Sequence, residues 1–344
     1  MGAMSTATLD RMLAILIGMQ LATGLLTLRA GSPPAAPLFV VHGLLGGALA
    51  AAAVVKLRRS LPPAIAAKRW RAIALSTALA LAVALALGGG FAWVASGRIV
   101  SIGPWTLLTL HVLAALAVVP IAVAHLLPRR WRVLRPVRRL PAHLRATADG
   151  QRLLTRRAAL GVAAVAMTGG LAWLASNVLD ALAGGFRRFT GSRWLAAGGI
   201  PPPTTFFGEG AAEIDQATWR LVVRGRVARV LDLSLDDLAS LGEVTREAVL
   251  DCTSGWAMRT TWGGVPLGAV LDAAGLTGRA TRVVIRSVTG WYAELPLLEA
   301  RGALLATRVG DRALPHGNGA PCRLVAPDRR GLEWVKWVTR IEVV

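Results

Sequence analysis

Long runs of apolar residues fill the first half of the 344-residue chain and are separated by short polar connections. A helix needs roughly 20 residues to cross about 30 Å of hydrocarbon. Stretches of that length lie at approximately 11–29, 37–56, 71–95, 104–127 and 158–180. The pattern therefore predicts an α-helical membrane bundle of five spans within residues 1–184.

A different pattern begins after residue 184. Residues 185–217 are rich in Gly and Pro, which is typical of a loop-like tether. Within 218–344, alternating or β-branched runs predict strands, and two short amphipathic stretches predict helices. The predicted strands are at 218–227, 281–288, 322–327 and 337–344, and the predicted helices are at 233–241 and 266–276. The sequence thus predicts an α+β domain after the membrane bundle.

The net charge of +20 is distributed unevenly between the two halves of the chain. Residues 1–184 hold 19 Lys and Arg against three acids, whereas residues 185–344 hold 20 against 16. The excess therefore belongs to the membrane half, and the later domain shows no basic stripe that would indicate a nucleic-acid partner.

The basic residues of the membrane half also predict its orientation. The connections after the second and fourth spans carry six and ten Lys or Arg, and the other two connections carry only Arg29 and Arg98. Basic connections stay on the cytoplasmic side. We expect a multi-pass protein of a bacterial cell membrane, with a cytoplasmic N-terminus and an extracytoplasmic domain after the fifth span.

Arg156 and Arg157 precede the moderately apolar fifth span, in the stretch TRRAALGVAAVAMTGG. Such a pair resembles a twin-arginine export signal placed inside the chain. The alternative is that both arginines only help to orient the span. The first interpretation would have the following domain exported in a folded state.

Histidines within the spans are candidate cofactor ligands, because ionisable residues at membrane depth are costly. His42 and His111 fall at matching depths in two spans that both run from outside to inside. Facing imidazoles can supply the two axial ligands of a b-type haem. His125 would suit a second haem, but the second span offers Lys56 at that depth. One haem near the outer face is the preferred hypothesis; interhelical hydrogen bonds or quinone contacts are the alternative.

Cys252 is one of two cysteines and follows an apolar run in the segment LDCTSGW. A lone cysteine can be a small buried apolar residue. As a thiolate it can instead bind a soft or high-valent metal. The residue type alone leaves both interpretations open.

Four blocks in order along the chain resolve that ambiguity. They are WRLVVRGRV with LSLDDL, LDCTSGW with WGGVPLGAVL, GWYAELPL with ALLATRVGDRALPHGNGAPCRLVAP, and WVKWVTRIEV. Together they resemble the molybdopterin domain of the sulfite oxidase family, including its exported bacterial reductases of protein methionine sulfoxide. The expected fold is therefore a five-span α-helical membrane bundle followed by an α+β sulfite-oxidase-like domain.

The resemblance implies roles for particular residues. Cys252 would bind molybdenum, and Ser287 would contact the cofactor through its hydroxyl. The pterin phosphate would be held by Asn318, Arg323, Lys336 and the backbone of Val335; Arg and Lys suit a doubly charged phosphate. The uncharged stretch after Cys252 departs from the sulfite-binding members. Thr204 or Thr205, before Phe206 and Phe207, stands where the exported reductases have Asn.

These observations predict a membrane-anchored molybdenum-dependent oxidoreductase that transfers oxygen atoms to or from an extracytoplasmic small molecule or protein sulfoxide. One haem b would exchange electrons with quinone or another carrier. The alternatives are a haem-free anchored enzyme served by a soluble carrier, and a membrane binding protein without catalysis.

Overall fold

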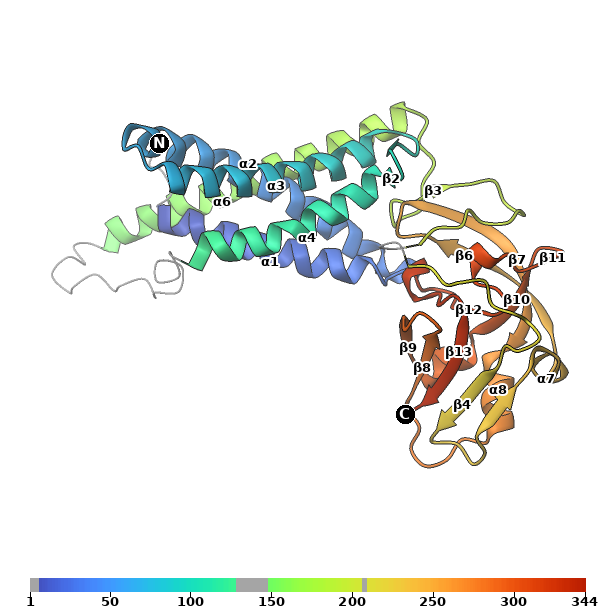
Figure 1. The fold of residues 1–344 in the computed structure, drawn as a ribbon. Coiled ribbons are helices and arrows are strands. Elements are labelled where there is room, and N and C mark those ends of the chain that lie inside the picture. The colour runs from blue at the N-terminus through green and yellow to red at the C-terminus, as the bar shows by residue number, and fades with distance from the viewer. Residues whose placement is uncertain (1–5, 128–147, 206–208) are drawn as a thin grey trace. The chain divides into compact units, whose positions relative to one another are not determined.

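The computed structural model describes residues 6–127, 148–205 and 209–344, and the chain forms two compact units (Figure 1). The first unit comprises Met1–Leu26 and Pro37–Phe186. The second comprises Thr27–Ala36 and Arg187–Val344. The short segment that joins the first two helices therefore belongs to the second unit.

Five long helices make up the first unit, as the apolar pattern predicts. They are α1 (Thr6–Thr27), α2 (Ala36–Ala66), α3 (Trp70–Ala95), α4 (Leu107–Leu126) and α6 (Ala148–Leu182). All five are long and apolar enough to cross a membrane. Many large apolar side chains on them are exposed, for example Leu81, Leu160 and Leu171, as a surface in contact with lipid requires.

Two of the helices extend beyond the predicted spans. Helix α2 continues to Ala66 instead of ending near residue 56, because Leu, Lys, Arg and Ala all favour a helix and Pro62 and Pro63 interrupt it only near its end. Helix α6 begins at Ala148, ten residues before the predicted span. Part of the basic charge thus lies on helical extensions. The basic stretch 128–147 lies outside the described residues.

Glycines let α2 and α6 approach each other closely. A Cβ atom added at Gly47 would overlap the backbone of Gly169, and one added at Gly43 would overlap the ring of Trp173. Small residues at such positions are the usual basis of helix packing in lipid. A cluster of buried apolar side chains from all five helices completes the interior, including Leu16, Leu49, Val83, Val118 and Val165.

Two sheets form the second unit (Figure 1). The first has the path β11-β10-β7-β3, with β12 paired to β10 and β6 paired to β7; the second has the order β5-β4-β13-β8-β9. The strands of the first sheet are β3 (Arg193–Trp194), β6 (Val244–Asp251), β7 (Trp256–Pro266), β10 (Leu304–Val309), β11 (Arg312–Ala313) and β12 (Arg323–Val325). Those of the second are β4 (Leu221–Gly225), β5 (Leu231–Leu233), β8 (Arg282–Ser287), β9 (Tyr292–Pro296) and β13 (Val338–Val343).

The strands and helices predicted after residue 217 are present. The predicted strands correspond to β4, β8, β12 and β13. The predicted helices correspond to α7 (Leu235–Ser240) and α8 (Leu267–Ala274). Helix α7 starts with a capping box between Ser234 and Asp237, and Gly275 takes a positive φ directly after α8. Both are ordinary helix-end signals.

The segment after α6 takes part in the first sheet. Strand β3 pairs in parallel with β7, and the amide groups of Arg193, Leu195 and Gly198 donate to carbonyls of residues 255–259. The larger part of the second unit therefore starts at Arg187, within the stretch 185–217 that the composition suggests as a tether. The Gly and Pro residues of 185–217 predict an irregular backbone, but they do not indicate that part of this stretch is buried against β7.

Candidate active site

A tight turn between β6 and β7 holds Cys252. Strand β6 ends at Asp251, and β7 starts at Trp256. The Cys252 amide donates to Trp256 O at 2.8 Å, and the Gly255 amide donates to Cys252 O at 3.0 Å. Gly255 has φ +106°, which a residue with a side chain rarely adopts. The turn fixes the cysteine backbone and leaves its sulfur 3.0 Å from Ser254 Oγ.

Arg323 brings a positive charge into the interior near this turn. Its side chain is buried against Trp262 and Trp334, with the guanidinium carbon 5.0 and 5.6 Å from the two ring centres, which are themselves 5.5 Å apart. It donates to the carbonyls of Asn318 and Trp334 at 2.9 and 3.3 Å. Burial lowers its pKa to about 10, although the nearby Cys252 favours its charged form. Cys252 and Arg323 therefore share one site.

Lys336 adds a second positive charge. Its ammonium donates to Thr204 O at 2.8 Å and to Gly317 O at 2.6 Å. Burial, followed by repulsion from Arg323, lowers the pKa of Lys336 to about 8. Asn318 lies on the same loop and donates to Pro201 O at 2.9 Å. The three phosphate-binding side chains predicted from the resemblance are thus in one region.

The protein balances the charge of this region only in part. Within the described part of the chain, Arg323 and Lys336 donate to backbone carbonyls and form no ion pair with a carboxylate, although Glu209 attracts Lys336 from a greater distance. Arg323 Nε is buried without a hydrogen-bond partner. Burying uncompensated charge is costly. The residues present therefore fit a bound anion such as a pterin phosphate.

Ser287 and Val335 lie beside these residues. Ser287, the last residue of β8, pairs with Val338 of β13, and its Oγ accepts a hydrogen bond from the Thr289 amide at 3.2 Å. Val335 precedes Lys336, is buried, and its carbonyl accepts from the Leu324 amide at 2.8 Å. All six residues expected to contact the molybdenum cofactor therefore lie in the second unit. Thr204 also borders the site, while Phe206 and Phe207 lie outside the described residues.

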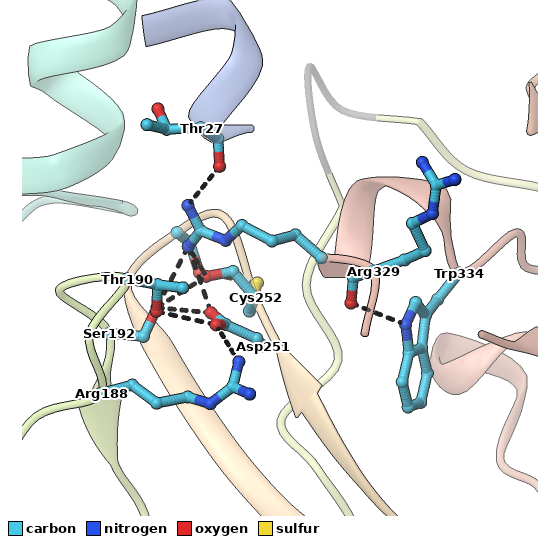
Figure 2. A network of polar contacts seen from close by, with 10 residues as sticks. Thr27, Arg188, Thr190, Ser192, Asp251, Cys252, Arg329 and Trp334 are labelled. Atoms are coloured by element: carbon cyan, nitrogen blue, oxygen red, sulfur yellow. Dashed lines mark hydrogen bonds and ion pairs between the residues drawn. The ribbon is translucent and has the colours of Figure 1, made fainter. Parts of the chain in front are cut away.

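A buried acid next to Cys252 was missed in the sequence analysis. Asp251 is fully buried and accepts from Arg188 Nη1 at 2.6 Å, Thr190 Oγ1 at 2.7 Å, Ser192 Oγ at 2.6 Å and Arg330 Nη2 at 3.2 Å (Figure 2). Burial favours its neutral form, but these four donors outweigh burial and lower the pKa of Asp251. The sequence feature that could have indicated this buried acid is its position at the end of the apolar run before Cys252.

The other cysteine is not suited to bind a metal. Cys322 is fully buried, and burial raises the pKa of its thiol to about 12. At neutral pH it remains a neutral thiol, which neither ligates metals nor reacts readily. It is part of the core, as its place in a predicted strand indicated.

In the first unit, the structure brings His42 and His111 together. Their ring centres are 6.1 Å apart, and the rings are nearly perpendicular at 82°. His111 Nδ1 lies 2.6 Å from Ala86 O, and His42 Nδ1 lies 2.9 Å from Thr23 Oγ1. A carbonyl can only accept, so His111 carries its proton on Nδ1. The Thr23 hydroxyl already donates to Met19 O at 2.8 Å, so it accepts from His42 in turn.

Both imidazoles therefore present the unprotonated Nε2, which is the form that binds a metal. Two imidazoles on opposite sides of one metal ion, with metal–nitrogen bonds of roughly 2 Å, have ring centres about 6 Å apart. The 6.1 Å between the ring centres of His42 and His111 is close to that separation. Lys56, at the depth of His125, instead forms an ion pair with Asp10.

Comparison with known proteins identifies the second unit. Residues 209–344 match the family described as oxidoreductase molybdopterin binding domain. Over these residues the chain is similar to the molybdopterin-binding domains of that family. The match confirms the resemblance carried by the four sequence blocks.

The molybdopterin-binding domain also aligns with curated proteins. It is similar to the protein-methionine-sulfoxide reductase catalytic subunit MsrP of Xanthomonas campestris pv. campestris, with 35% identity over 39% of this chain and 47% of the relative. The MsrP of Gluconobacter oxydans is 29% identical over 40% of this chain and 54% of the relative. This chain thus spans about half the length of the curated relatives it matches.

Among solved structures, the sulfane dehydrogenase SoxCD from Paracoccus pantotrophus matches with a TM-score of 0.38 and 26% identity. That match covers 39% of this chain and 40% of the other.

Proposed function

We propose that the chain is a membrane-anchored, molybdenum-dependent oxidoreductase that reduces a sulfoxide outside the cytoplasm with electrons delivered through the membrane unit. The observation that carries the proposal is the placement of Cys252 near the buried Arg323 and the partly buried Lys336, neither of which is ion-paired with a carboxylate in the described residues, in a region that matches the molybdopterin-binding family. The similarity to MsrP favours a sulfoxide as the substrate and reduction as the direction.

Each protein group has a defined task in this proposal. The Cys252 thiolate would hold molybdenum, and Arg323, Lys336 and Asn318 would bind the pterin phosphate together with the Val335 backbone; Ser287 would hydrogen-bond the cofactor. The bound cofactor supplies two-electron oxygen-atom transfer. Trp262 and Trp334 pack against the Arg323 guanidinium and help to exclude water from it, which strengthens its attraction for an anion.

The net reaction takes two electrons and two protons. A sulfoxide loses its oxygen and becomes a thioether, and the oxygen leaves as water. A membrane quinol is the proposed reductant, because its oxidation to quinone releases two electrons and two protons.

His42 and His111 would hold one haem through their Nε2 atoms. A haem supplies one-electron transfer and so connects quinol oxidation to the two-electron chemistry at molybdenum. Thr23 and the Ala86 carbonyl keep both Nδ1 protons in place, which fixes the ring orientation. The pairing of Lys56 with Asp10 argues against a second haem.

The protein orientation is part of the proposal. The segment Thr27–Ala36 follows the first helix, and Arg187 follows the fifth; both belong to one unit. A compact unit has to lie on one side of the membrane, which agrees with five crossings. The basic connections then favour the extracytoplasmic side for this unit. Export by Arg156 and Arg157 remains an additional hypothesis.

Metal analysis and visible spectra of the purified chain test the proposal. Cys252→Ser is expected to lose molybdenum and to keep the haem absorbance. His111→Leu should lose the haem and all quinol-driven sulfoxide reduction, while it keeps molybdenum and remains active with a reduced dye. His125→Leu is the matched control on the same helix and should retain both cofactors.

The outcomes separate the alternatives. Wild-type protein with full molybdenum occupancy, no haem absorbance and no electron uptake from quinol would refute electron delivery through the membrane unit and favour a soluble carrier. Wild-type protein without molybdenum after expression in a cofactor-producing host would refute the enzyme and favour a binding protein.

A further inference from the structure

We infer that Arg330 is a positioning residue that fixes the metal-binding cysteine and links its turn to two segments distant in sequence. The inference rests on the proposed role of Cys252 as a molybdenum ligand. Arg330 is almost fully buried and contacts the turn through the Cys252 carbonyl.

The guanidinium of Arg330 makes contacts with four groups. Its Nη2 donates to Cys252 O at 3.0 Å, Ser192 Oγ at 3.1 Å and Asp251 Oδ1 at 3.2 Å. Its Nη1 donates to Thr27 O at 3.3 Å. Arg330 therefore ties together the turn, the segment after the fifth helix and the segment after the first helix.

The Cys252 carbonyl is held from two directions. The Gly255 amide donates to it from within the turn, and Arg330 donates from outside. Gly331 brings the next piece of backbone against the same residue, because a Cβ atom there would lie 3.4 Å from Cys252 Cα. A carbonyl and Cα fixed in this way leave the sulfur little freedom other than rotation of its side chain.

Asp251 keeps Arg330 in place. The other carboxylate oxygen, Asp251 Oδ2, accepts hydrogen bonds from Arg188 and Thr190. Arg188 therefore shares with Arg330 the task of neutralising the charge of Asp251. Ser192 donates to Asp251 and accepts from Arg330, which closes a ring of hydrogen bonds. The distinguishing task of Arg330, compared with Arg188, is its direct bond to the cysteine.

The difference between the two arginines provides the test. Arg330→Met removes the bond to Cys252 and keeps the aliphatic stem. Arg188→Met is the matched control, because it removes a cation from Asp251 without touching Cys252. The measurement is the alkylation rate of Cys252 by iodoacetamide in the full-length chain purified from a host that lacks the molybdenum cofactor. Cys322 contributes no signal because it is buried with a raised pKa, and Cys252→Ser gives the blank.

Arg330→Met is expected to alkylate about tenfold faster than wild type, the factor expected when one hydrogen bond from a charged donor is lost. Arg188→Met should stay within about twofold. If Arg330→Met does not accumulate, Arg330→Lys serves instead, since one ammonium retains the charge but cannot reach all partners at once. An unchanged rate in a folded Arg330 variant, or an equal increase in Arg188→Met, would overturn the inference.

A second readout uses the loaded enzyme. In Arg330→Met, the electron paramagnetic resonance signal of Mo(V) should shift or broaden and kcat should fall with KM unchanged, because Arg330 touches the ligand and not the substrate. Failure of the wild-type chain to bind molybdenum would refute the proposed function alone, because the alkylation rates do not depend on the metal.

Discussion

Arg323 and Lys336 carry charge into a part of the second unit where their neighbours are carbonyls and aromatic rings. Carbonyl oxygens solvate a cation but do not neutralise it. Burial lowers the pKa of Arg323 to about 10; burial, and then repulsion from Arg323, lowers the pKa of Lys336 to about 8. A phosphate would provide the missing negative charge.

Cofactor binding should therefore depend on pH through Lys336. A bound phosphate raises the pKa of Lys336, so above pH about 8 the free protein has to take up a proton to bind the cofactor. The affinity is expected to fall as pH rises above that value, by up to about tenfold per pH unit. The measurement is the molybdenum retained after gel filtration at increasing pH.

Two variants control that experiment. Lys336→Gln should bind weakly at every pH, and Lys336→Arg, which stays charged, should lose the pH dependence in this range. A wild-type retention curve that is flat from about pH 7 to 9.5 would contradict the role of Lys336.

Some residues of the candidate site can be recognised from the sequence, and others cannot. Cys252 and the cations at 323 and 336 were recognisable because they stand in blocks of characteristic order. Asp251 and Arg330 were not, because their partners are far apart in the chain: Asp251 meets residues about 60 positions earlier, and Arg330 meets Ser192 at a separation of 138. Local patterns hold no information on such pairs.

At the scale of elements, apolar length predicts the helices reliably and their ends poorly. Lipid sets the minimum length of a span, but the polar continuation of α2 to Ala66 depends on helix propensity outside the apolar stretch. Strand β3 shows the opposite case. Its two residues carry no strand pattern, and only pairing with β7 defines it.

The close approach of α2 and α6 makes Gly47 sensitive to substitution. Gly47→Val is expected to lower the melting temperature of the detergent-solubilised protein and to reduce haem content, because the added side chain would push α2 away from Gly169 and move His42 on the same helix. Visible absorbance during a thermal ramp measures both effects.

Gly18→Val is the matched control, because a Cβ atom at Gly18 meets nothing within 4 Å. Loss of haem to the same degree in both variants would show that a general loss of stability, and not helix spacing, is responsible.

For the whole molecule, the decisive question is which surfaces face outward. The proposed topology places Ser101, between α3 and α4, outside, and Ala67, after α2, inside; both are exposed. Cys322 is buried, and Cys252→Ser removes the other native thiol, so a new surface cysteine can be labelled selectively in that background. Ser101→Cys in intact cells should react with a membrane-impermeant maleimide, and Ala67→Cys should react only after the cells are opened. The reverse result would invert the orientation.

The hydrogen bond between Arg330 and Thr27 joins residues 303 positions apart. A ribosome that adds roughly 5–20 residues per second completes that interval in about 15–60 s. The segment Thr27–Ala36 is therefore synthesised long before its partners at 328–330, and all four remaining long apolar helices are synthesised in between. The segment Thr27–Ala36 is the first part of the second unit to be synthesised, yet it can form its contacts with residues 328–330 only after nearly the whole chain has been made.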